Sequence, residues 1–263
     1  MDLELVGKRA FVSGSTRGIG YAIAEGLARE GARIVLNGRH ERGVQRAVDA
    51  LTTSVPGADV TGIAADFADA AQVQHLVAAV GEVDILVNNV GVFDIRDFAA
   101  ISDDEWQRYL DVNVMSGVRL SRQVFVGMLE RGWGRIIFVS SESGVDVPAN
   151  MIHYGTTKAA ALALANGLAK ATRGTRVTVN SILGGPTYSD GVAAAVEQLA
   201  RARDMPVDAA KAAIAQQNRT SLLQRFIEPS EIASLALYLA SPHSSATNGA
   251  ALRADGGTLT TIL

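Results

Sequence analysis

The sequence contains no cysteine among its 263 residues. This absence excludes disulfide bonds, a cysteine-ligated zinc or iron–sulfur site, and catalysis by a thiol nucleophile. The histidines do not suggest a metal site either, because they lack the spacing of metal ligands. They lie at His40, His75, His153 and His243.

An excess of positive charge is also lacking. The chain carries 24 Lys and Arg against 27 Asp and Glu, which gives a net charge of −3. No dense basic run interrupts this balance. Nucleic acid is therefore not an expected partner.

No apolar run approaches the about 18 residues of a membrane-spanning helix. The start, Met1-Asp2-Leu3-Glu4, lacks the basic segment that opens a signal peptide. We therefore expect a soluble, unprocessed, cytoplasmic protein with no membrane partner. The lack of cysteine is consistent with a reducing compartment.

Hydrophobic residues make up 48% of the chain, enough to bury a sizeable core. No linker, repeat or low-complexity stretch divides it, so residues 1–263 are predicted to form a single domain. Short β-rich runs alternate with longer Ala-rich segments of helical period. The predicted strands are Arg9–Ser13, Ala32–Asn37, Asp59–Ala64, Val83–Asn88, Gly134–Ser140, Arg176–Ile182 and Ala250–Arg253. The predicted helices are Ile19–Glu30, Glu41–Thr53, Ala70–Ala79, Asp103–Glu130, Tyr154–Thr172 and Pro229–Ala240.

Seven strands separated by helices predict an α/β fold with a mainly parallel sheet covered by helices on both faces. The helix over Asp103–Glu130 has clear end signals. Ser102 and Glu105 have the spacing of a capping box, and Gly132 offers a left-handed stop. The segment Thr187–Ser221 breaks the alternation and resembles an appended helical pair.

A glycine-rich turn follows the first strand and opens the first helix: Gly14, Ser15, Thr16, Arg17, Gly18, Ile19 and Gly20. In this context glycines let the backbone approach a pyrophosphate, and the helix N-terminus supplies free N–H groups. The alternative is a simple tight turn. The spacing differs from the G-x-G-x-x-G dinucleotide fingerprint.

Together with Asn88-Asn89-Val90-Gly91, Asn113, Ser141 and Tyr154-Gly155-Thr156-Thr157-Lys158, this turn resembles the short-chain dehydrogenase/reductase family. The likeness runs from about residue 5 to Gly257. It implies a Rossmann-type doubly wound sheet of order 3-2-1-4-5-6-7. It also implies a nicotinamide cofactor over the carboxyl ends of the strands.

Tyr154 and Lys158 lie four apart near the start of a predicted helix, so both side chains leave the same face. An ammonium this close stabilises phenolate over phenol. Lowering a tyrosine pKa from ~10 to ~7 requires roughly 4 kcal/mol, which Lys158 and the oxidised nicotinamide would supply. Tyr154 is then the predicted general acid and base for a carbonyl or alcohol. The alternative is an ordinary surface pair.

The resemblance implies two further catalytic residues. The family serine lies thirteen residues before the tyrosine, which selects Ser141 rather than Ser140 to hold the substrate oxygen. Asn113 would distort its helix and hold a water on a proton path from Lys158. Without the resemblance, each side chain is equally readable as an ordinary polar residue of a turn or a solvated helix face.

The resemblance also places residues around the cofactor. Asp66 would contact the adenine amine and Asn88 the adenine-side ribose. Val90 replaces the usual alanine, which narrows the pocket beside Gly91. At the nicotinamide, Gly184 replaces the usual proline before Gly185, and either Thr187 or Ser189 would bind the carboxamide.

Cofactor choice depends on the end of the second strand. Gly38 occupies the position at which NAD enzymes of this kind carry an acidic residue, and Arg39 follows it. Arg17 faces the same pocket. Two guanidiniums suit a 2′-phosphate, so NADP(H) is predicted over NAD.

The sequence thus predicts an NADP(H)-dependent oxidoreductase that interconverts a small carbonyl compound and an alcohol. The alternatives are an NAD-dependent enzyme with the same tetrad, dehydration or epimerisation, and a regulator that binds a nucleotide without chemistry. The Ala-rich helix from Tyr154 is apolar on more than one face, which predicts a homotetramer, with a dimer as runner-up.

Three further interpretations concern the substrate cleft. The segment Thr187–Ser221 is predicted to be a substrate lid, with an apolar stripe at Val192, Val196 and Leu199; the alternative is permanent packing on the core or a neighbouring subunit. Glu142 and Asp146 meet a polar substrate or lie in a solvated loop. His153 lines the cleft or is an ordinary helix-start residue.

Overall fold

The fold is built on one seven-stranded sheet. The computed structural model describes residues 2–262, apart from the side chains of residues 190, 191, 195 and 217. The strands are β1 (Arg9–Val12), β2 (Arg33–Gly38), β3 (Val60–Ala64), β4 (Ile85–Asn88), β5 (Trp133–Ser141), β6 (Arg176–Gly184) and β7 (Ala251–Ala254). They follow the order β3-β2-β1-β4-β5-β6-β7, and each neighbouring pair is parallel. This confirms the predicted fold, with strand ends within about two residues of those expected.

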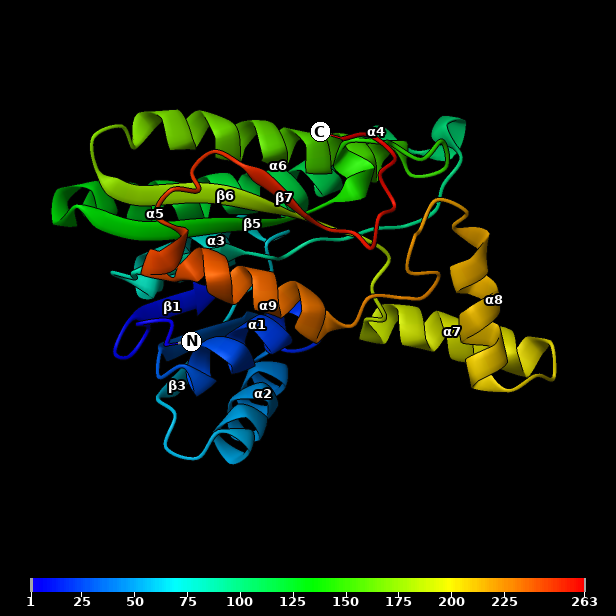
Figure 1. Ribbon diagram of the computed structural model, residues 1–263, viewed down its shortest axis with the longest axis horizontal. Helices are drawn as coiled ribbons and strands as arrows, with labels where there is room; N and C mark the ends of the chain where they lie inside the picture. Colours follow the sequence, from blue (N-terminus) through cyan, green and yellow to red (C-terminus); the bar gives the residue numbers. More distant parts are fainter. Residues whose placement is uncertain (1, 263) are drawn as a thin grey trace.

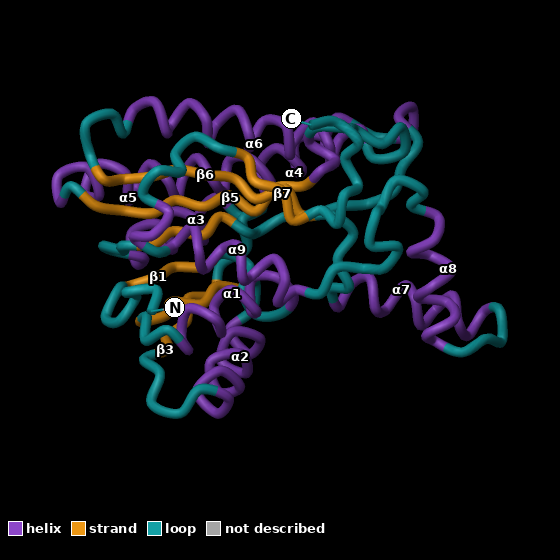
Figure 2. The backbone as a smooth tube through the Cα atoms, in the orientation of Figure 1, coloured by secondary structure: helices purple, strands orange, loops and turns teal. Residues whose placement is uncertain are grey.

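Two helical layers cover the sheet, as Figures 1 and 2 show. One face packs on α1 (Gly18–Arg29), α2 (Glu41–Ser54) and α9 (Pro229–Ala240). The other packs on α3 (Ala70–Val80), α5 (Ser116–Arg131) and α6 (Ile152–Ala171). Successive strand residues alternate between the two cores: Ala10 and Val12 enter the first, and Phe11 enters the second. Strands buried on both faces explain the continuous apolar runs of the sequence.

The long helix expected over Asp103–Glu130 is interrupted. It consists of α4 (Asp103–Tyr109), a π-helical turn over Leu110–Met115, and α5. Ser102 caps its start by accepting a hydrogen bond from the Glu105 N–H at 3.2 Å. The Glu105 carboxylate, expected to complete the box, instead lies 3.7 Å from Arg96. Gly132 ends the helix in the left-handed region, as expected.

The segment after β6 forms α7 (Asp190–Ala202) and α8 (Val207–Gln217), which project from the body of the molecule in Figure 1. Val196 is fully buried in a small cluster shared with Ala200 and Ala210, and Val192 and Leu199 pack against that cluster. The apolar stripe therefore lies against α8 and not over the cleft or the core. Within residues 2–262, no helix has the length and apolar character needed to cross a membrane.

Candidate active site

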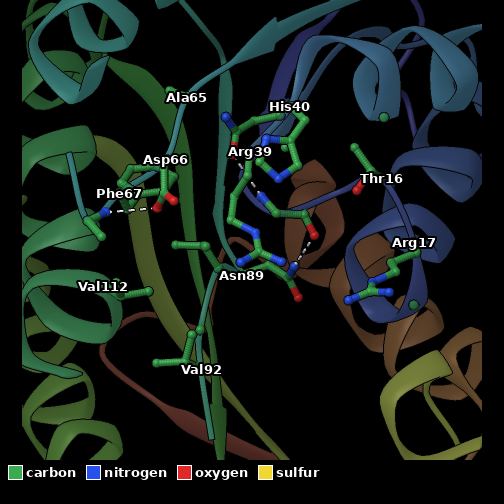
Figure 3. A pocket seen from close by; sticks show the side chains of 18 of the residues that line it. Thr16, Arg17, Arg39, His40, Ala65, Asp66, Phe67, Asn89, Val92 and Val112 are labelled. Carbon is green, nitrogen blue, oxygen red and sulfur yellow. Dashed lines mark hydrogen bonds between the residues drawn. The ribbon is translucent and has the colours of Figure 1, made fainter. Parts of the chain in front are cut away.

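A cavity of about 1100 Å³ runs along the carboxyl ends of β1, β2, β3 and β4. Figure 3 views it from close by. Parallel sheets with helices on both faces bind ligands at this edge. Its lining includes many of the expected cofactor residues: Gly14, Thr16, Arg17, Gly18, Arg39, Asp66, Val90 and Gly91.

The glycine turn is held in shape by polar groups beneath it. The Ser15 hydroxyl donates to the Val12 carbonyl at 2.6 Å and accepts from the Asn37 N–H at 3.0 Å. The side-chain Oδ1 of Asn37 accepts from the Gly14 N–H at 3.0 Å. A Cβ at Gly20 would lie 2.5 Å from the Gly14 carbonyl oxygen, so only glycine fits there. Ser15 therefore has a supporting role under the turn.

The neighbouring residues Asn88 and Asn89 occupy different environments. Asn88 is buried, and its amide donates to the Ser121 hydroxyl on α5 at 3.2 Å. Asn89 lines the cavity and donates to the carbonyls of Ser13 and Gly14 at 3.0 and 2.9 Å. The sequence interpretation missed Asn89 and Asn37, although both are short amides at strand ends. Asn88 itself is not a lining residue of the cavity.

The end of the cavity beside β2 is cationic. Arg17 and Arg39 line it and are exposed, and neither forms an ion pair among the described residues. A side chain at Gly38 would overlap the Thr16 methyl group. Position 38 therefore carries no carboxylate, and a side chain there fits only if Thr16 moves. A glycine cradle beside two unpaired guanidiniums fits the phosphates of NADP.

Tyr154 and Lys158 occupy the first turns of α6, next to the end of β5. Lys158 is buried, and its Nζ donates to the Val139 carbonyl at 3.0 Å. Burial lowers the pKa of Lys158 to about 8 and raises the pKa of Tyr154 above its ordinary value, which a hydrogen bond with Ser141 partly offsets. The protein's own groups therefore favour the phenol, whereas the sequence predicted that Lys158 helps to favour phenolate.

Asn113 lies inside the π-helical turn, in agreement with the expected helix distortion. Its carbonyl oxygen accepts from the Val92 N–H at 2.8 Å, and its amide donates to the Val92 carbonyl at 2.9 Å. The amide also donates to the Thr157 hydroxyl at 3.0 Å. That hydroxyl donates to the Tyr154 carbonyl at 2.7 Å. Asn113 thereby ties the loop after β4 to the helix that carries Tyr154.

The loop after β4 lies between the cavity and the predicted catalytic residues, which are not themselves in the cavity lining. Phe93 lines the cavity, and its ring lies edge-on to the Tyr154 ring with centroids 6.2 Å apart. A Cβ at Gly91 would lie 3.4 Å from the Lys158 Nζ. The cavity therefore ends close to Tyr154 and Lys158.

At the end of β6, the glycine that replaces the usual proline still belongs to the strand. β6 continues through Gly184 and pairs it with Ser141 and Ala254, so the replacement does not loosen a turn at this position. Gly185 needs to be glycine, because a Cβ there would lie 2.5 Å from the Asp255 carbonyl oxygen. The Thr187 hydroxyl donates to the Gly185 carbonyl at 2.8 Å.

Ser189 precedes α7 and makes no side-chain cap to it. The carboxamide contact stays a prediction for both Thr187 and Ser189. Neither hydroxyl nor Gly185 lies in the lining of the cavity, and Ile19 and Gly20 sit behind the glycine turn.

The structure decides between the alternatives left open for three side chains near Tyr154. His153 is fully buried and packs on Tyr109 with ring centroids 4.1 Å apart, so it does not line the cleft. Asp146 is exposed, whereas Glu142 is half-buried and its carboxylate accepts a hydrogen bond from the Ser141 hydroxyl. A solvated loop is therefore wrong for Glu142. Among the described residues, no cluster of acidic and histidine side chains is suited to hold a metal ion.

Comparisons with known proteins agree with this geometry. The sequence profile of the short chain dehydrogenases matches residues 8–200. The chain is 44% identical to the "uncharacterized oxidoreductase YvaG" of Bacillus subtilis (strain 168) over the full length of both proteins. It is 32% identical to D-beta-hydroxybutyrate dehydrogenase of Cupriavidus necator, with 96% of this chain and 98% of that protein covered.

The fold is also similar to a solved structure with bound ligands. L-sorbose reductase from Gluconobacter frateurii, complexed with NADPH and L-sorbose, superposes with a TM-score of 0.94 and 33% identity, and each chain is covered completely.

Proposed function

The chain belongs to the short-chain dehydrogenase/reductase family of oxidoreductases, and we propose that it is an NADP(H)-dependent enzyme that interconverts a carbonyl compound and an alcohol. One arrangement carries this proposal. Tyr154, Ser141 and Lys158 adjoin one end of a cavity whose other end presents Arg17 and Arg39.

In the reductive direction, Tyr154 gives its phenolic proton to the substrate oxygen, and Ser141 holds that oxygen beside it. The bound cofactor supplies the hydride. Burial keeps Tyr154 protonated in the free protein, as a general acid requires. Lys158 stabilises the negative charge that proton transfer leaves on Tyr154. Asn113 fixes the loop after β4 through its hydrogen bonds. As the family resemblance implies, Asn113 also holds a water on the proton path from Lys158.

The preference for NADP(H) over NAD(H) rests on the end of β2. A charge-assisted hydrogen bond to the 2′-phosphate contributes about 1.5 to 3 kcal/mol, or roughly 10- to 150-fold in affinity. The lack of space at Gly38 disfavours the acidic side chain that would select the ribose hydroxyl of NAD. The NADPH bound to the similar L-sorbose reductase supports the same choice.

The substrate is a small molecule held between Tyr154 and the α7–α8 pair. The similarity to L-sorbose reductase and to D-beta-hydroxybutyrate dehydrogenase supports a small polar carbonyl compound. We further propose that residues 187–221 close over it as a lid. The apolar stripe around Val196 is already covered by α8. The two helices therefore close together as one unit.

We also propose a homotetramer, in which α6 pairs across a two-fold axis. Ala163 is exposed on α6, and Val126 is exposed on the neighbouring helix α5. Apolar side chains on two adjacent helices gain free energy from burial against a second copy. Light scattering at micromolar concentration tests the proposed tetramer. A monomer contradicts the proposal, and a dimer means that the simpler assembly replaces the tetramer.

The direct test of function is consumption of NADPH and NADH with a panel of small aldehydes, ketones, keto acids and keto sugars. We expect turnover with NADPH and a catalytic efficiency at least tenfold lower with NADH. Product analysis separates carbonyl reduction from dehydration or epimerisation. Equal or better efficiency with NADH contradicts the cofactor assignment, and cofactor binding without turnover of any compound contradicts the enzymatic one.

A further inference from the structure

Glu142 is a half-buried acid that the mechanism above does not use. It follows Ser141, the last residue of β5, and opens a short 3-10 turn over Glu142–Gly144. Its two carboxylate oxygens accept hydrogen bonds from the hydroxyls of Ser141 and, at 3.3 Å, Ser143. Among the described residues it has no ion-pair partner. Of the hydrogen bonds of Glu142, only the one from Ser141 connects it to the reacting groups.

The hydrogen bonds around the Ser141 oxygen limit what it can do. A serine hydroxyl has one proton to donate and two lone pairs that accept. The oxygen accepts from the Ser143 N–H at 3.1 Å. The Ser141 hydroxyl also lies beside Tyr154 and lowers its pKa, as a donor to the phenolate oxygen does. While Glu142 is ionised, the Ser141 proton points to Glu142. The Ser141 hydroxyl then offers no proton to Tyr154 or to a substrate oxygen.

Protonation of Glu142 reverses the direction of these bonds. The neutral carboxyl donates to Ser141, whose lone pairs are then filled by Glu142 and the Ser143 N–H. The only direction left for the Ser141 proton is toward the substrate oxygen and Tyr154. One proton on Glu142 thus turns the Ser141 hydroxyl toward the substrate.

Resting on the proposed carbonyl reduction, we propose that Glu142 is a positioning residue whose protonation aims the Ser141 hydroxyl at the substrate oxygen. Its charge therefore sets the pH range in which the enzyme reduces its substrate. No covalent step is added, because the proton on Glu142 only selects between two orientations of the same hydrogen bonds.

The surroundings of Glu142 let it gain this proton at a higher pH than an exposed glutamate does. Burial raises the pKa of the Glu142 carboxyl above its ordinary value of 4.5, although the serine hydrogen bonds oppose the shift. The titratable groups that face it are Tyr154 and Lys158 on α6, and its charge raises the pKa of both. The end of β6 beside the turn is Ile182–Gly184, which has no titratable side chain.

The kinetic test compares Glu142→Gln with the wild-type enzyme between about pH 5 and pH 7, below the pKa of about 8 of Lys158. The glutamine amide can donate to Ser141 at every pH, as the neutral acid does. We expect wild-type kcat/KM for carbonyl reduction to fall by up to about tenfold per pH unit above the pKa of Glu142. The Glu142→Gln profile should be flat over the same range.

Two variants serve as controls. Asp146→Asn makes the same chemical change on the exposed carboxylate of the neighbouring turn and should keep the wild-type slope. Glu142→Asp keeps a carboxyl group and should restore the slope with its midpoint moved. A slope in Glu142→Gln equal to that of the wild type, in an enzyme that remains active, overturns the proposal and leaves the proposed function standing.

A second measurement is independent of catalysis. Infrared difference spectroscopy during a pH titration should show the stretching band of a protonated carboxyl that disappears as the pH rises. The band should be missing in Glu142→Gln and present in Asp146→Asn. If the wild type reduces no carbonyl compound, the proposed function fails while this band still reports on Glu142; if no such band titrates, the role of Glu142 is refuted whatever the enzyme reduces.

Discussion

The two ends of the cleft differ in how far their charged groups are exposed to water. At the end beside β2, Arg17 and Arg39 are exposed and unpaired, and the backbone of the glycine turn does the shaping. At the end beside α6, Lys158 is buried, and burial moves the pKa values of Lys158 and Tyr154 in opposite directions. One end keeps its charges in water, and the other removes them from it.

This contrast determines how each end responds to change. Exposed charges are screened by salt within about 10 Å, so each guanidinium acts almost independently. Buried groups that share hydrogen bonds are coupled, so the loss of one changes the others. We therefore expect small additive effects at the arginine end and large non-additive effects around Tyr154.

The largest effect is expected from Tyr154→Phe, which removes the proton donor and keeps the ring. Turnover should fall by ~10² to 10⁴, the range of general acid catalysis, while the affinity for NADPH changes little. Steady-state kinetics and a fluorescence titration of NADPH measure the two quantities. Tyr238→Phe, a half-exposed tyrosine on α9, is the matched control.

Near-normal turnover of Tyr154→Phe would remove Tyr154 from the mechanism. Lys158→Ala should lower both turnover and NADPH affinity, because its ammonium is buried next to Gly91 at the edge of the cavity. A loss in turnover alone would restrict Lys158 to the chemical step.

A smaller effect is expected at the exposed end. Arg39→Ala and Arg17→Ala should each weaken NADPH binding by roughly 10-fold, the lower end of the range for a charge-assisted hydrogen bond, because both side chains are solvated. The double variant should show the product of the two effects, and added salt should reduce it.

Arg42→Ala is the control, since Arg42 is exposed on α2 outside the cavity. NADH binding should be unchanged in all three arginine variants. An equal loss of NADH affinity would show that Arg17 and Arg39 act on a part of the cofactor other than the 2′-phosphate.

Burial of Lys158 should also appear in the stability of the fold. Its pKa is about 8 in the folded protein against an ordinary 10.5, so the unfolded state binds more protons between these values. The free energy of unfolding should therefore rise with pH across this window, by at most about 1.4 kcal/mol per pH unit. The raised pKa of Tyr154 opposes this only above its ordinary value of 10.

Urea unfolding at several pH values measures this slope. Lys158→Met should abolish it, and Lys170→Met, at an exposed position on the same helix, should retain it. A slope that survives in Lys158→Met would mean that another group is responsible.

The smallest effect is expected in the α7–α8 pair, which belongs to neither end. Its buried cluster centres on Val196, Ala200 and Ala210 and is far smaller than the two cores of the sheet. Hydrogen exchange across residues 187–221 should be fast in the free protein and slower with cofactor and substrate bound. The strand β5 serves as the internal reference. Exchange that is equally slow in both states would rule out the proposed lid.

The sequence predicted the exposed end of the cleft better than the buried one. The sequence allows a prediction for Gly38, Arg39 and Arg17, because their expected roles follow from residue spacing and from the presence or absence of charge. The crowding of Gly38 by Thr16 could not be predicted, since the two residues meet across separate elements. The strand order followed from the family resemblance, which covers nearly the whole chain.

At the buried end, residue identities were predictable and environments were not. Tyr154, Lys158 and Ser141 were selected by spacing, but the direction of the Tyr154 pKa shift depends on burial that no local pattern encodes. Glu142 was assigned to solvent because a charged residue after a strand usually lies there. Its burial results from the 3-10 turn that packs against α6.

The crowding of Gly38 constrains the order in which cofactor preference can change during evolution. An acidic residue at position 38 would select NAD, yet its first carbon already overlaps the Thr16 methyl group. Gly38→Asp alone is therefore expected to impair binding of both cofactors. A smaller residue at position 16, such as serine, would open this space. We therefore expect Gly38→Asp to bind NAD better together with Thr16→Ser than alone, so that the effect of one substitution depends on the other.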